Sequence, residues 1–146
     1  MGAIPWAYFV PYEADVEVAL DKLKNREFAA GRFYPAMQQR QVLIEESSPG
    51  SVSDYATIED AVVAAGETGT RSILDMWGLS EEPEFASLFQ VEDETLMDLY
   101  GTTEPTKEML LDLQILDPLD RLQGCYAIAY ENDKPIEILF TGFSAD

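Results

Sequence analysis

The feature that most constrains the fold is a pair of apolar runs near the end of the chain, in CYAIAYENDKPIEILFTGF at residues 125–143. A polar stretch at residues 131–134 separates the two runs and carries the turn-forming residues Asn132 and Asp133. Apolar runs on either side of such a stretch are typical of a β-hairpin. We predict a hairpin whose loop is longer than the two-residue minimum.

A companion strand is predicted at residues 3–11, AIPWAYFVP. Period-two alternation places Trp6 and Tyr8 on one face and Ala7 and Phe9 on the other. Both faces are apolar, so we expect both to be covered by other elements. We expect this strand to meet the hairpin.

Four helices are predicted from the spacing of apolar residues and from residues that cap helices. They are bounded by Asp15 and Gly31, by Thr57 and Gly66, by Glu92 and Gly101, and by Thr103 and Asp117. Short strands are expected at residues 70–76 and 85–91, and residues 37–44 fit either a helix or a strand. Strands and helices are interspersed, and the only hairpin-like adjacency is at the end of the chain. This order predicts one α+β domain over residues 1–146, a small mixed or antiparallel sheet with helices packed on it.

The segment at residues 45–56 is predicted to be a loop, because it contains the sequence SSPGSVSD. Long loops within a domain are often mobile surface segments or lids over a site. The composition favours a mobile surface loop, and a functional lid is the alternative.

The charge of the chain excludes several classes of partner. The 146 residues include 28 acidic and 9 basic side chains, which gives a formal net charge of −19. Such a surface repels nucleic-acid phosphates and anionic lipid headgroups, so we expect neither nucleic acid nor a membrane as partner. It suits a basic protein partner, and the plainer interpretation is that it keeps the chain solvated.

The cysteine count and the N-terminal sequence bear on the compartment. Cys125 is the only cysteine, which excludes an internal disulfide and fits a reducing environment. The first fifteen residues lack the basic start and the helical apolar core of a signal peptide, and no run approaches the ~20 apolar residues of a membrane span. We expect a soluble, cytoplasmic protein.

The sequence offers no recognisable catalytic or metal-binding motif. The chain has no histidine, which removes the usual general base and the histidine-activated nucleophiles. One cysteine without histidine excludes zinc spacing, and no glycine pattern of a phosphate loop is present. We predict no catalytic residue, no metal and no cofactor. The lack of these motifs favours a non-enzymatic protein.

The remaining signal is a group of aromatic residues in or beside the predicted strands. At the rim of a sheet, tyrosine and tryptophan can form a binding patch, and an arginine can anchor its ligand. The plainer interpretation is that the aromatic residues form the core. The candidate ligand- or partner-binding residues are Trp6, Tyr8, Tyr12, Arg71, Asp75 and Tyr126.

Three stretches of the chain resemble a group of small uncharacterised bacterial proteins. They are IPWAYFVPY at residues 4–12, GTRSILD at 69–75 and PIEILFTGFS at 135–144. The resemblance implies a bacterial, cytosolic origin and implies no activity and no site residues.

Three hypotheses of function follow. The first is a non-enzymatic binding or regulatory protein, similar in role to an immunity or inhibitor protein, that faces a basic protein partner. The second is a small-ligand-binding protein or enzyme with a pocket between the sheet and residues 32–56, where Arg71 contacts the ligand. The third is a homo-oligomeric structural component, such as a homodimer that pairs an exposed sheet face across a two-fold axis.

Overall fold

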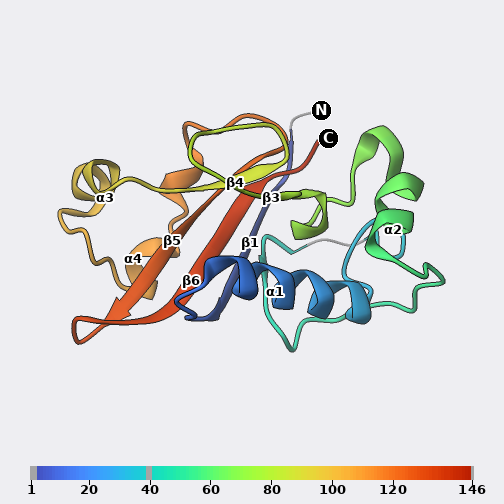
Figure 1. Cartoon of the computed structure of the whole chain (residues 1–146), viewed down its shortest axis with the longest axis horizontal. Helices are drawn as coiled ribbons and strands as arrows, with labels where there is room; N and C mark the ends of the chain where they lie inside the picture. Colours follow the sequence, from blue (N-terminus) through green and yellow to red (C-terminus); the bar gives the residue numbers. More distant parts are fainter. Residues whose placement is uncertain (1–2, 39–40, 146) are drawn as a thin grey trace.

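The hairpin and the first strand form the centre of a sheet in the computed structural model, which describes residues 3–38 and 41–145 (Figure 1). Strands β5 (Gln123–Glu131) and β6 (Lys134–Phe143) pair with each other in antiparallel fashion. Strand β1 (Pro5–Pro11) pairs antiparallel with β6 along its whole length. The expected meeting of the first strand and the hairpin is confirmed.

Shorter strands extend this centre into a mixed sheet with the order β2-β1-β6-β5-β4-β3. The added strands are β2 (Leu43–Ile44), β3 (Gly78–Ser80) and β4 (Ser87–Gln90), and each pairs in parallel with its neighbours. Among the described residues, β6 is thus the one strand that runs against the others. The predicted single α+β domain with a mixed sheet is confirmed, and the end of the ambiguous 37–44 segment is a strand.

The parallel pairs are connected in two different ways. Helix α1 (Val16–Ala30) lies between β1 and β2, and helices α3 (Asp93–Tyr100) and α4 (Lys107–Leu110) lie between β4 and β5. Residues 81–86 alone connect β3 to β4, although parallel strands usually need a much longer crossover. The short connection suffices because each of these strands is only one or two pleats long.

Each face of the sheet carries its own core. Trp6, Tyr8 and Phe140 pack with α1, with α2 (Ile58–Ala65) and with the 3-10 helix Ile73–Asp75. Ala7 lies on the opposite face, in the core that contains residues of α3 and α4. The predicted alternation of β1 and the covering of both its faces are confirmed.

The prediction of a strand at residues 70–76 is wrong. Ser72 caps the 3-10 helix Ile73–Asp75, where its Oγ accepts a hydrogen bond of 3.1 Å from the Leu74 N–H. Arg71 adopts a φ of 55°, which an extended strand does not allow. Polar side chains that bond to the local backbone compete with a strand ladder, and here they prevail.

The prediction of one continuous last helix is also wrong. Helix α4 ends at Leu110, and the 3-10 helix Gln114–Leu116 follows after Leu113, whose φ is 56°. The Asp112 carboxylate accepts hydrogen bonds from the Gln114 N–H at 3.0 Å and from the Gln114 side-chain amide at 2.6 Å. These local bonds favour a turn over the helix that the apolar spacing predicts.

The hairpin loop is shorter than predicted. Glu131 pairs with Lys134, so Asn132 and Asp133 are the whole loop. Both residues have positive φ, 51° and 63°, as a type I′ turn requires. Asn and Asp tolerate this conformation better than other non-glycine residues, and the type I′ twist matches that of the paired strands.

We predict that Asp133→Gly stabilises the protein by about 0.5–1 kcal/mol, because glycine adopts a positive φ without strain. Urea denaturation measures the difference. Asn25→Gly, in the middle of α1, is the control, since there glycine should cost stability. A loss of stability in Asp133→Gly contradicts the assigned turn.

Candidate functional site

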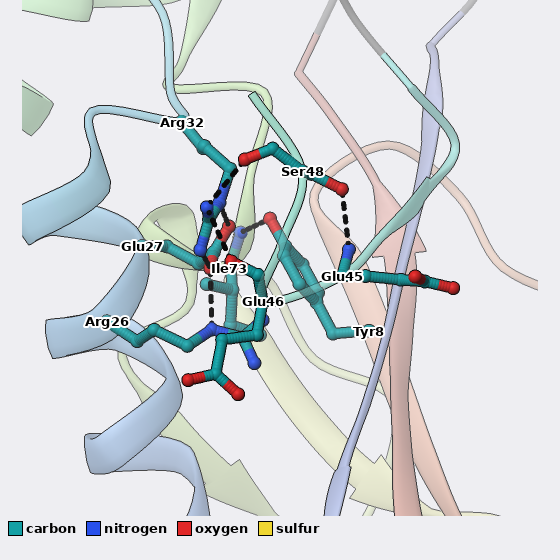
Figure 2. Close-up of polar contacts among 8 residues, drawn as sticks. All are labelled: Tyr8, Arg26, Glu27, Arg32, Glu45, Glu46, Ser48 and Ile73. Carbon is teal, nitrogen blue, oxygen red and sulfur yellow. Dashed lines mark hydrogen bonds and ion pairs between the residues drawn. The ribbon is translucent and has the colours of Figure 1, made fainter. Parts of the chain in front are cut away.

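A buried ion cluster near the C-terminal end of α1 fixes the loop that follows β2 (Figure 2). Glu27 has no exposed area and accepts hydrogen bonds from Arg32 at 2.8 and 2.6 Å and from Arg26 Nε at 2.8 Å. Arg32 Nη1 also donates to the carbonyl oxygens of Glu46 at 3.1 Å and Ser48 at 2.9 Å. The hydrogen bonds that the Arg32 guanidinium donates to Glu27 raise its pKa above the usual value. The cluster therefore ties the start of the 45–56 segment to α1, and mobility of that segment stays a prediction.

We predict that Glu27→Gln lowers the free energy of unfolding by about 3–5 kcal/mol, because it leaves the buried guanidinium of Arg32 and the half-buried one of Arg26 without their carboxylate. Urea denaturation provides the measurement. Asp21→Asn, on an exposed position of the same helix, is the matched control and should change stability by no more than about 0.5 kcal/mol. Equal effects of the two substitutions contradict the assigned role of Glu27.

A second polar cluster holds the turn that precedes β3. Asp75 Oδ1 accepts hydrogen bonds from the Thr70 N–H at 2.7 Å and from Thr70 Oγ1 at 2.8 Å. Thr70 Oγ1 also lies 2.8 Å from Ser72 Oγ, and the Tyr8 hydroxyl accepts from the Ile73 N–H at 3.2 Å (Figure 2). All these side chains are buried. The structure thus brings two predicted site residues, Tyr8 and Asp75, to the same turn, where they hold it against β1.

Three of the predicted site residues lie in the core rather than at a rim. Trp6 and Tyr8 have no exposed area, and their ring centroids are 5.7 Å apart. Tyr126 is 8% exposed and packs on Phe140 at 5.9 Å. The expected surface location is corrected here, because α1 and the turn before β3 cover the face of the sheet to which these rings belong.

The two other predicted site residues are more accessible. Tyr12 is half-buried and packs at the border of the core that contains Trp6 and Tyr8. Arg71 is half-buried, and its guanidinium carbon lies 4.8 Å from the centre of the Tyr34 ring. The structure does not bring Tyr12 and Arg71 into one patch with the remaining four predicted residues.

The described residues contain neither a metal-binding cluster nor a reactive thiol. Within residues 3–38 and 41–145, no group of three or more carboxylate or thiol side chains lies close enough together to hold a metal ion. Burial raises the pKa of the Cys125 thiol to about 12, which keeps it protonated and unreactive near neutral pH. The same part of the chain contains no helix with the length and apolarity of a membrane span.

Two aromatic side chains lie exposed at the β3 end of the sheet. Trp77, directly before β3, is 75% exposed, and Phe85, shortly before β4, is 61% exposed. Their rings meet edge to face, with centroids 5.8 Å apart. The backbone N–H of Trp77 donates a hydrogen bond of 2.7 Å to the carbonyl oxygen of Ala86, which holds the two segments together. Exposed side chains of this size in contact form a candidate recognition patch.

Three carboxylates lie in the loop between these aromatic residues. Glu81, Glu82 and Glu84 are exposed, and within the described part of the chain none of them forms an ion pair. The Ser80 hydroxyl donates to the Glu82 carbonyl at 2.7 Å, which orders the start of the loop. We call Trp77, Glu81, Glu82, Glu84 and Phe85 the aromatic–acidic surface.

Sequence reasoning missed this surface. It assigned Phe85 to the start of the strand expected at residues 85–91. A signal was present, because two large aromatic residues flank an acidic, proline-containing loop. That the rings face solvent follows only from the pairing of β3 with β4, since alternation alone cannot tell a buried ring from an exposed one.

We predict that the two tryptophans differ in fluorescence. Trp77 should emit at long wavelength and be quenched by acrylamide, because it is exposed, whereas Trp6 is fully buried. Trp77→Phe should therefore leave a blue-shifted spectrum with little quenching. A spectrum that stays red-shifted and quenchable in this variant shows that Trp77 is not the exposed ring.

Comparison of the chain with protein-family models, with curated proteins and with solved structures gives no match. The functional assignment therefore depends on the geometry of the candidate surfaces.

Proposed function

We propose that the chain is a non-enzymatic binding protein whose aromatic–acidic surface docks a basic protein segment. The observation that carries the proposal is the exposed Trp77–Phe85 ring pair beside three carboxylates without ion-pair partners in the described chain. The face of a tryptophan ring attracts lysine and arginine cations, and aromatic residues recur among the hot spots of interfaces. The carboxylates supply the complementary charge.

The charge of the whole chain supports the same partner. A net charge of −19 attracts a basic protein over a distance of about a Debye length, ~10 Å at 0.1 M salt, and so raises the association rate. The single cysteine, which is buried, fits a cytoplasmic protein in a reducing environment. We therefore place the interaction in the cytoplasm.

The test uses a synthetic peptide rich in arginine and lysine, and the same peptide with citrulline and acetyl-lysine in their place. Isothermal titration should detect binding of the basic peptide alone, with an affinity that falls about tenfold or more from low to moderate salt. Trp77→Ala should weaken binding about tenfold, which corresponds to about 1.4 kcal/mol. Binding that is indifferent to salt, or equal for both peptides, contradicts the proposal.

Two matched controls separate the surface from general effects. Val63→Ala removes another exposed apolar side chain, which is 80% exposed on α2, and should leave the affinity unchanged. Replacement of Glu81, Glu82 and Glu84 by glutamine should weaken binding more than replacement of the exposed Glu17, Glu67 and Glu131, although both change the net charge by three. Equal losses show that the net charge, rather than this surface, attracts the peptide.

Self-association is the other use that an exposed aromatic pair at a sheet edge allows. Light scattering distinguishes it from the proposed function. A dimer that becomes a monomer in Trp77→Ala assigns the surface to a second copy of the chain and overturns the proposal of a basic partner.

A further inference from the structure

Arg71 is held in an uncommon setting. Its φ of 55° lies in the left-handed region, and its guanidinium stacks on Tyr34 at 4.8 Å. Its Nε is buried and has no hydrogen-bond partner within residues 3–38 and 41–145. A buried donor without a partner is destabilising, so a ligand that accepts from it would gain affinity.

The unpaired charge of Arg71 contrasts with the ion pairs formed by other cations of this acidic chain. Arg26 and Arg32 bind Glu27, and Lys107 binds Glu137 at 3.3 Å. Arg71 forms no ion pair with any carboxylate of the described residues. In a chain this acidic, a half-buried guanidinium that no carboxylate within residues 3–38 and 41–145 neutralises is a candidate site for an external anion.

A small cavity adjoins Arg71, between the turn before β3 and the segments that flank β2. It has a volume of about 30 Å³. Its walls include the apolar side chains Tyr34, Met37 and Ile44 beside Thr70 and Arg71. A cavity of this volume holds about two water-sized groups, such as the two oxygens of a carboxylate. It is too small for a nucleotide or a sugar.

Two other polar side chains of the wall, those of Arg32 and Thr70, are already engaged. Arg32, which also lines the cavity, donates to Glu27 and to the carbonyls of Glu46 and Ser48. Thr70 is bonded to Asp75. Among the described residues that line the cavity, Arg71 therefore supplies the positive charge that remains available. Its planar fork matches a carboxylate with two parallel N–H···O bonds.

We propose that this cavity binds the carboxylate of a small organic acid or of a peptide C-terminus, paired with the Arg71 guanidinium. The Tyr34 ring holds the plane of the guanidinium, the carboxylate fills the cavity, and the rest of the ligand extends out of it. The site shares no residue with the aromatic–acidic surface, so the two proposals can be tested independently of each other.

The test titrates sodium butyrate into the ¹⁵N-labelled protein and follows the Arg71 Nε–H resonance by NMR. A saturable shift is expected in the millimolar range. N-acetyl-leucine and its amide distinguish the carboxylate from the rest of a peptide end: the acid should bind and the amide should not. Stronger binding of N-acetyl-leucine than of butyrate assigns the cavity to a peptide C-terminus, and the reverse assigns it to a free organic acid.

Thermal shift compares the variants. Butyrate should raise the melting temperature of the wild type and of Lys134→Gln, which removes the same charge from the exposed first residue of β6. The rise should be lost in Arg71→Gln. In Arg71→Lys, which keeps the charge but loses the fork, the same rise should need about tenfold more butyrate. Absence of a saturable shift at Arg71, or an undiminished melting-temperature rise in Arg71→Gln, overturns the proposal.

Discussion

The pairing of β1 with β6 is the interaction on which the rest of the structure depends. It joins the two ends of the chain through seven residue pairs, from Pro5 opposite Phe143 to Pro11 opposite Glu137. At its end, Ile4 and Ser144 exchange two hydrogen bonds of 2.9 Å. Because this pairing is central, residues 6–10 of β1 face one or the other of two cores, and each face must be covered by a connection that leaves the sheet and returns to it.

Two buried polar clusters then position the irregular segments on one face. Tyr8 reaches from β1 to the Ile73 N–H and holds the turn before β3, while Glu27 reaches from α1 to Arg32 and holds the segment after β2. The stretches IPWAYFVPY, GTRSILD and PIEILFTGFS meet at this point through the β1–β6 pairing and the Tyr8 hydrogen bond. The three stretches thus meet for a structural reason, and the cavity beside Arg71 adjoins the second of them.

The two proposed sites have opposite electrostatic character. The aromatic–acidic surface presents carboxylates to a cationic partner at the edge of the sheet, whereas the Arg71 cavity presents one guanidinium to an anion. The net charge of −19 favours the first at long range and opposes the second. Binding in the cavity therefore depends on short-range contacts: the fork geometry of Arg71, the stacked Tyr34 ring and the removal of water from a small space.

The sequence by itself determined the features that local periodicity and capping control. Alternation in β1, the two hairpin strands, and the helices capped by Asp15 and Thr57 are all present in the structure. Tertiary structure decided the short strands β2 and β3, because two or three residues carry too little pattern to be recognised without their partners. It also decided exposure. Trp6 lies in β1, and Trp77 lies directly before β3. Helix α1 helps to cover the Trp6 ring, whereas the Trp77 ring lies in solvent at the end of the sheet. Neither outcome is a property of the residue or its neighbours in sequence, since burial is set by which distant segment packs on each face.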